Sequence, residues 1–113
     1  MTTMTNQGRL IGRIGKVSFD EQSKVVHILI LTDSGRENDP DMHFVKAFDK
    51  TAQRFLDEPK GALVDVACHI NSHWYKDQLG QDHYSVDIIA DTFLNLESKA
   101  TLKYRQEKEI SVN

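Results

Sequence analysis

Residues 42–61 read MHFVKAFDKTAQRFLDEPKG, a strand-like segment followed directly by a helical one. Its opening part, 42–48, predicts a β-strand on which Phe44, Lys46 and Phe48 share one face, because side chains alternate between faces along a strand. A lysine between two phenylalanines indicates that this face is at least partly wet. The alternative is that the rings are core residues, and it is stronger for Phe44 than for Phe48.

The second part of the stretch predicts one short helix. Asp49 is a residue type favoured at the N-cap, and Pro59 and Gly61 end the helical pattern. The apolar residues at helical spacing, which we expect to face the core, are Ala52, Phe55 and Leu56.

Further strands are predicted on both sides of this strand and helix. They are 9–17, 24–32, 62–70 and 83–96. Glycines at 8, 12 and 15 punctuate the first of them, as expected for a strand that bends or bulges around a small barrel. Turn-forming residues fill 33–41, which predicts a loop, and 76–82, which predicts a hairpin tip.

The order of elements is therefore three strands, one short helix and two strands joined by a hairpin. This order predicts an all-β fold, a five-stranded OB-fold Greek-key barrel with the helix between the third and fourth strands. An unrelated α+β sandwich with the same order is the alternative. We assign residues 1–96 to the barrel and 97–113 to a short polar C-terminal tail, mobile or marginally helical.

Composition limits the class of protein. A chain of 113 residues with 39% hydrophobic residues fits one globular domain, with no membrane-spanning run and no secretory signal. The single cysteine, Cys68, cannot form an internal disulfide, which fits a reducing cytoplasm. The net charge of −3 argues against a strongly basic nucleic-acid binder, although a local basic stripe is sufficient for binding.

No catalytic or metal-binding pattern stands out. The chain has no GxSxG elbow, no Gly-rich phosphate loop and no HExxH helix. Cys68, His69 and His73 are zinc-ligand types, but Cys68 and His69 would point to opposite faces of a strand. Asp65 and Asp87 are isolated carboxylates that we expect to be solvated. We therefore expect no enzyme, no metal and no cofactor.

Aromatic rings interleaved with cations are the feature that points to a function. Unpaired bases expose their π-faces, so a single-strand binder needs stacking rings beside cations that track the phosphates. Trp74 and Tyr75 are adjacent and point to opposite sides of an extended chain, so one of them could be packed. The candidate DNA-binding residues are Arg9, Arg13, Lys16, Lys46, Phe48, Lys50, His73, Trp74, Tyr75 and Lys76. The cations of the first strand could instead form an ordinary solvated face.

Three segments, in order, resemble the bacterial single-stranded DNA-binding proteins. They are LIGRIGK (10–16), HFVKAFDKTAQRFLDEPKG (43–61) and YKDQLGQDHYSVDIIAD (75–91). The resemblance covers most of residues 8–95. It implies an OB-fold that forms homo-oligomers, dimers or tetramers, and wraps single-stranded DNA without sequence preference.

The resemblance also suggests roles for single residues. Phe48 matches a stacking phenylalanine, Lys50 its neighbouring lysine, and His43 a histidine at a subunit contact. Tyr75 takes the place of a stacking tryptophan and Trp74 the preceding basic position, so which ring stacks stays open.

The chain also departs from the family pattern. Met42 replaces a stacking tryptophan, and the last residues, KEISVN, lack the acidic, hydrophobic-tipped end that recruits repair enzymes in cellular members. These departures favour a phage, plasmid or divergent member with weaker binding.

Three functions follow as hypotheses. The first is sequence-independent binding and protection of single-stranded DNA in replication, recombination or repair, in the cytoplasm of a bacterial or phage-infected cell. The second is an OB-fold accessory module that acts mainly through contacts with replication or recombination proteins. The third is binding of single-stranded RNA, which the 2′-OH would distinguish from DNA.

Overall fold

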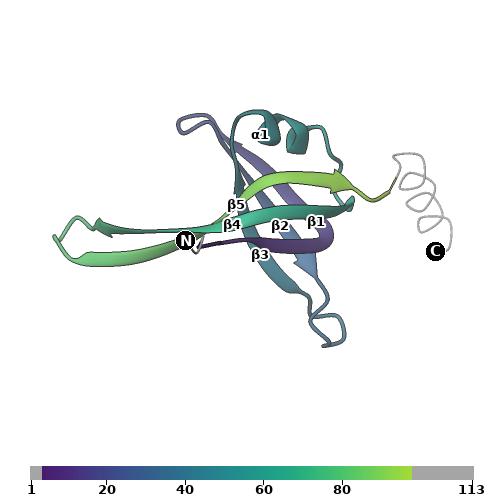
Figure 1. The fold of residues 1–113 in the computed structure, drawn as a ribbon, viewed down its shortest axis with the longest axis horizontal. Coiled ribbons are helices and arrows are strands. Elements are labelled where there is room, and N and C mark those ends of the chain that lie inside the picture. The colour runs from purple at the N-terminus through teal and green to yellow at the C-terminus, as the bar shows by residue number, and fades with distance from the viewer. Residues whose placement is uncertain (1–3, 98–113) are drawn as a thin grey trace.

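Five strands close into a barrel in the order β1-β2-β3-β5-β4 in a computed structural model that describes residues 4–97 (Figure 1). The elements are β1 Gly8–Asp20, β2 Val25–Thr32, β3 Asp41–Ala47, α1 Asp49–Leu56, β4 Leu63–Lys76 and β5 Asp82–Asn95. The predicted all-β barrel, with its helix between the third and fourth strands, is confirmed. The predicted tail lies outside the described residues except for Glu97.

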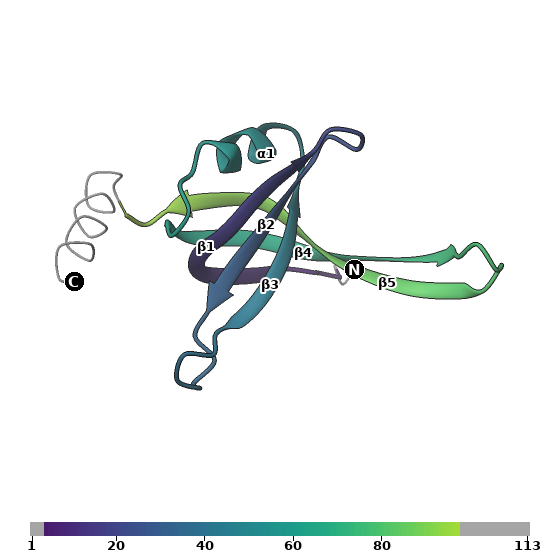
Figure 2. The same ribbon diagram turned by 180° about the vertical axis from the view of Figure 1, so that it is seen from behind.

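Strand β1 is long enough to take part in both sides of the barrel. Its residues Gly8–Arg13 pair with β4, and its residues Arg13–Asp20 pair with β2. The register shifts between Ile14 and Lys16, so the bulge predicted from the first-strand glycines lies at Gly15. Figure 2 shows β1 and β2 curving together, with β3 continuing the same sheet. A short parallel pairing of β3 with β5, at Val45↔Ile88 and Lys46↔Ile89, closes the barrel.

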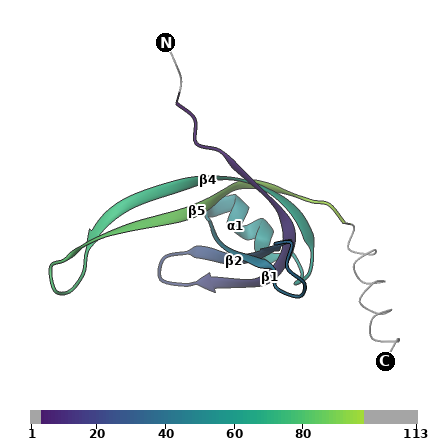
Figure 3. The same ribbon diagram turned by 90° about the horizontal axis from the view of Figure 1, so that it is seen from below.

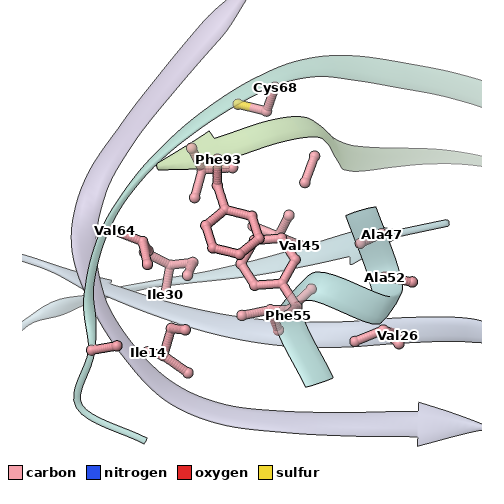
Figure 4. Packing of buried hydrophobic residues seen from close by; sticks show 14 residues of the cluster. Ile14, Val26, Ile30, Val45, Ala47, Ala52, Phe55, Val64, Cys68 and Phe93 are labelled. Carbon is pink, nitrogen blue, oxygen red and sulfur yellow. The ribbon is translucent and has the colours of Figure 1, made fainter. Parts of the chain in front are cut away.

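The core is filled from all five strands and from α1 (Figure 4). The rings of Phe55 and Phe93 stack at its centre, with centroids 3.9 Å apart. Ala52 and Phe55 face this core, as predicted. Leu56 does not: it is exposed, because it lies one residue past Phe55 at the end of α1 and therefore points away from the barrel.

The start of α1 differs from the prediction. Phe48, not Asp49, is the N-cap residue, with extended backbone (φ −126°, ψ 156°) and no side-chain capping hydrogen bond. Asp49 is the first helical residue and has φ of 53°, in the left-handed region that side chains other than glycine rarely adopt. The prediction of an Asp49 cap is therefore wrong, because the chain turns sharply into the helix at Asp49 itself.

Asp49→Gly should stabilise the protein by about 0.5–1 kcal/mol, because glycine adopts positive φ without the contact between Cβ and backbone. Urea unfolding followed by circular dichroism measures the change. Gln53→Gly is the control in the same helix, at a residue whose φ is not positive. There glycine should destabilise by up to about 1 kcal/mol. A loss of stability in Asp49→Gly would contradict the prediction.

A second backbone constraint lies at Gly12, where β1 passes from β4 to β2. A Cβ atom at this position would lie 2.2 Å from the carbonyl oxygen of Leu31, which is backbone and cannot rotate away. Gly12→Ala should therefore destabilise the protein by about 1–3 kcal/mol in a urea titration. Gly15→Ala is the control, because the three atoms nearest to its Cβ would be side-chain atoms of Leu29 and Leu31, at 3.3–3.4 Å. Equal losses in the two variants would contradict the argument.

Strands β4 and β5 continue beyond the barrel as a two-stranded ribbon (Figures 1 and 3). The fourth strand was predicted to end at residue 70, whereas pairing runs on to Lys76↔Asp82. At the base of the ribbon, the side-chain amide of Asn6 donates to the carbonyl of Ile70 and accepts from its N–H. We refer below to the part of β4 and β5 beyond Ile70 as the ribbon.

The ribbon ends in the turn predicted at 76–82. The Asp77 carboxylate accepts hydrogen bonds from the backbone N–H groups of Leu79 and Gln81, and its other oxygen lies 2.6 Å from Nε2 of His83. The hydrogen bond with His83, followed by those from the backbone, lowers the pKa of Asp77 from its ordinary value. The turn is thus organised around one carboxylate.

Cys68 is sealed inside the barrel beside β1. A Cβ atom on Gly8 would lie 3.2 Å from its Sγ, so the Gly8 residue lies close against the thiol. Burial, with a smaller contribution from the charge of Asp91, raises the pKa of the Cys68 thiol. His69 points to the opposite face, as predicted, with Nδ1 2.8 Å from Asp91 Oδ1. Within residues 4–97 no group of three or more His, Cys, Asp or Glu side chains could hold a metal ion.

The described residues also contain no helix long and apolar enough to cross a membrane.

Candidate nucleic-acid interface

The alternation of side chains along β4 assigns the two aromatic residues of the ribbon to different faces. Val64, Val66 and Cys68 are buried in the core, and the same two-residue period continues to Trp74. Trp74 therefore lies on the face that continues the barrel interior, whereas Tyr75 lies on the outer face. Trp74 is 70% exposed and Tyr75 50%, so neither ring is packed in the core.

Each ring has an aromatic neighbour on β5. Trp74 pairs across the strands with Tyr84, with ring centroids 5.2 Å apart. Tyr75 pairs with His83, with ring centroids 5.3 Å apart and planes 22° apart. Cross-strand aromatic pairs of this kind stabilise a ribbon that has no core beneath it. They also leave flat ring surface open on both faces.

Strand β3 carries a second pair of exposed rings. Val45 and Ala47 point into the barrel, so Phe44 and Phe48 point outward, 72% and 43% exposed respectively. The expectation that Phe44 is more readily a core residue is wrong, because the smaller residues of β3 take the inward positions. Phe44 was absent from the predicted binding set. The two-residue alternation of β3 was the signal for including Phe44, but it does not tell which of the two faces is buried.

Two ion pairs connect the outer face of β3 to the outer face of the ribbon. Lys46 Nζ lies 3.2 Å from Asp87 Oδ1, and His73 Nδ1 lies 3.8 Å from Asp87 Oδ2. Strand β5, which carries Asp87, lies between β3 and β4 in the barrel. One continuous outer surface therefore carries rings and cations together. We call it the outer track, and it consists of Phe44, Lys46, Phe48, His73 and Tyr75.

Most of the other predicted cations are held by carboxylates. Arg9 forms a bidentate ion pair with Asp65. Arg13 forms an ion pair with Glu97 and donates a hydrogen bond to the carbonyl oxygen of Gly61. The predicted phosphate contact Lys76 lies 2.9 Å from Asp82 at the end of the ribbon. None of the ion pairs within residues 4–97 includes Lys16 or Lys50.

The two acidic residues expected to be solvated are largely covered instead. The side chains of Asp65 and Asp87 are only 13% and 19% exposed, because cations from neighbouring strands lie over them. The hydrogen bonds from Arg9 lower the pKa of Asp65, and Asp65 in turn raises the pKa of Arg9. These carboxylates therefore neutralise basic side chains of the same chain, and the net charge of −3 is unchanged by the pairing.

His43, predicted at a subunit contact, lies at the far end of the β2–β3 pair. Its Nε2 is 2.7 Å from Oγ1 of Thr32, and its side chain is half-buried. Its role between subunits stays a prediction.

Comparisons with known proteins show which proteins this chain is similar to. A single-stranded DNA-binding protein of Streptococcus pyogenes serotype M1 is 45% identical over 42 residues, which is 37% of this chain and 26% of that protein. The single-stranded DNA-binding protein 1 of Lactococcus lactis is 37% identical over 54 residues, 48% of this chain and 36% of that protein. The matched segments thus span about a third or less of these relatives.

Solved structures share the fold at low sequence identity. A mitochondrial single-stranded DNA binding protein of S. cerevisiae superposes with a TM-score of 0.62 at 18% identity, covering 84% of this chain and 99% of that one. A Plasmodium falciparum SSB, solved in complex with single-stranded DNA, gives 0.58 at 19% identity and covers 86% and 99%. The model of the single-strand binding protein family matches residues 5–96. The barrel, the ribbon and the outer track thus occur in a chain that belongs to the single-strand binding protein family.

Proposed function

We propose that this chain binds single-stranded DNA without sequence preference along the outer track, and that it acts in DNA replication, recombination or repair. The observation that supports this most directly is the exposure of Phe44, Phe48 and Tyr75 on one face together with Lys46 and His73. Such a surface offers stacking to any base and positive charge to the backbone, without hydrogen bonds that would read sequence.

The proposed path runs along β3 and onto the ribbon. Phe44 and Phe48 stack bases over the barrel, and Lys50, just past Phe48, neutralises a phosphate at that end. Tyr75, supported by His83, stacks a base on the outer face of the ribbon. Arg9, Arg13 and Lys16 lie on β1, where the two arginines are already paired, so we assign them a secondary role.

The test is a titration of fluorescently labelled oligo-dT with the full chain, followed by anisotropy at about 50 and 200 mM salt. We expect saturable binding that weakens as salt rises, because each phosphate contact releases a counterion. Duplex DNA of the same length is the control and should bind more weakly. Absence of oligo-dT binding at the lower salt would refute the proposal.

Trp74 provides a separate test of the inner face of the ribbon. It is the only tryptophan of the chain, so the intrinsic fluorescence reports on this position alone. Saturating oligo-dT should quench it if the strand also contacts the side of Trp74 and Tyr84. An unchanged spectrum at saturation would confine the DNA to the outer track and remove Trp74 from the binding set.

We also propose that the chain forms a homo-oligomer, a dimer or a tetramer, with His43 at a subunit contact. Light scattering on the free protein and on the oligo-dT complex measures the mass. A monomer in both states would contradict this part of the proposal.

A second function is favoured by the ion pairs on the predicted cations. Arg9, Arg13 and Lys76 are neutralised within the chain, and the net charge is −3, which suits a protein partner better than a phosphate backbone. An accessory module of this kind would bind oligo-dT weakly while forming a stable complex with a replication or recombination protein. Oligo-U, titrated at equal salt, tests the third possibility of RNA binding.

A further inference from the structure

Among residues 4–97, Asp87 is the one carboxylate that forms charge contacts with two side chains of the outer track, Lys46 and His73. Its Oδ1 faces Lys46 of β3 at 3.2 Å, and its Oδ2 faces His73 of β4 at 3.8 Å. Each carboxylate oxygen thus contacts a nitrogen from a different strand. The side chain is 19% exposed, so the carboxylate lies between its partners rather than in open solvent.

The position of Asp87 follows from the way the barrel closes. Lys46 is opposite Ile89 in the parallel pairing of β3 with β5, and Asp87 lies two residues earlier on the same face of β5. Asn71 is its cross-strand partner on β4, which brings His73 within reach. The carboxylate therefore sits where the β3 part of the outer track meets the ribbon part. A DNA strand passing from Phe48 to Tyr75 must cross this point.

We propose that Asp87 sets the affinity of the single-strand site by occupying Lys46 and His73 in the free protein, so that DNA must displace it. This inference rests on the proposed function. A phosphate arriving between the barrel and the ribbon replaces the Asp87 carboxylate at these two side chains, instead of meeting them unoccupied. This exchange of one anion for another reduces the net gain in free energy from binding.

The exchange has a signature in the salt dependence. For single strands, the slope of log K against log salt changes by about 0.7 for each phosphate neutralised. A cation that is paired with a carboxylate neutralises less of the phosphate charge, and fewer counterions are therefore released from the DNA. Freeing the Lys46 ammonium should steepen the slope by about 0.7.

The test is Asp87→Asn in the full chain, titrated with labelled oligo-dT at several salt concentrations. Asparagine keeps the shape and removes the charge. We expect binding to tighten roughly three- to fivefold at low salt, as for the loss of one partly exposed ion pair, with the steeper slope given above. Asp91→Asn is the charge-matched control: it lies on the same strand and pairs with a histidine outside the outer track, His69. It should change affinity less than twofold and leave the slope unchanged.

A double variant identifies the cation that is released. Adding Lys46→Gln to Asp87→Asn should abolish most of the gain, since the freed lysine is then absent. A gain that persists in the double variant, or an equal gain in Asp91→Asn, would show a general charge effect and overturn the proposal. Tighter binding by Lys46→Gln alone would overturn it as well.

A measurement on the unmodified protein covers the case in which Asp87→Asn does not fold. The side-chain carboxyl carbon of Asp87, observed by NMR, should shift when oligo-dT is added, while that of Asp91 stays in place. An Asp87 resonance that does not move at saturation overturns the inference, although the proposed function stands. If oligo-dT does not bind the unmodified protein at all, the proposed function itself has failed.

Discussion

Alanine in place of Phe48 or of Tyr75 is expected to weaken the binding of oligo-dT by about 1–3 kcal/mol in each case. Both rings are exposed on the outer track, one at the end of β3 and the other on the ribbon. Removing either ring deletes a stacking surface but leaves the neighbouring cations in place. Because the two residues are carried by different parts of the fold, we expect their losses to be roughly additive in the double variant.

Anisotropy titrations at one fixed salt concentration measure these losses. Phe19→Ala is the matched control, because Phe19 is 46% exposed, close to the value for Phe48, but lies near the far end of β1 outside the outer track. It should leave affinity unchanged. Normal affinity in both track variants, or an equal loss in Phe19→Ala, would refute the stacking assignment. A loss in only one would restrict the site to the barrel or to the ribbon.

Phe55→Ala should destabilise the fold by about 3–5 kcal/mol, the largest effect that we expect from any single substitution. Phe55 is fully buried and stacks on Phe93, with ring centroids 3.9 Å apart. The guanidinium of Arg54 lies over the Phe93 ring, 4.3 Å from its centroid. Alanine would remove the stacked ring and leave a cavity at the centre of the barrel. Since whole domains are stable by only about 5–15 kcal/mol, the variant should lie close to the limit of folding.

Urea unfolding followed by circular dichroism measures this effect. Leu56→Ala is the control in the same helix: Leu56 is the adjacent residue and is exposed, so its loss should be within about 0.5 kcal/mol. If the two variants lost the same stability, Phe55 could not be the centre of the core. A folded Phe55→Ala protein should still bind oligo-dT at low temperature, because Phe55 lies in the core and the outer track lies on the outside of the barrel.

The order of strands and helix was predictable because each element carries a local signal. The glycines of the first strand predicted a bulge or bend, and the bulge lies at Gly15. The two-residue period of a strand correctly predicted that Cys68 and His69 lie on opposite faces. Local signals failed at Leu56 and Asp49. There, the path of the chain between β3 and α1 decides which way a side chain points and which φ it adopts.

The residue types of the candidate binding surface were predictable from the sequence, but their arrangement in space was not. Residue types suggested rings beside cations, yet Arg9 and Asp65 are 56 residues apart in sequence, and their pairing depends on the register of β1 against β4. Phe44 was underestimated for the same reason, since its exposure depends on which side of β3 faces the barrel. Pairing across strands is a property of the closed barrel, which no local pattern contains.

The burial of Cys68 beside Gly8 of β1 has a practical consequence for spectroscopy. A thiol that is both covered and reluctant to ionise should react slowly with maleimides, so the native protein needs no cysteine removal before labelling. Leu79, highly exposed at the tip of the ribbon, is a suitable position for one introduced cysteine. A dye attached there would report, in single-molecule fluorescence recordings, when single-stranded DNA reaches the ribbon.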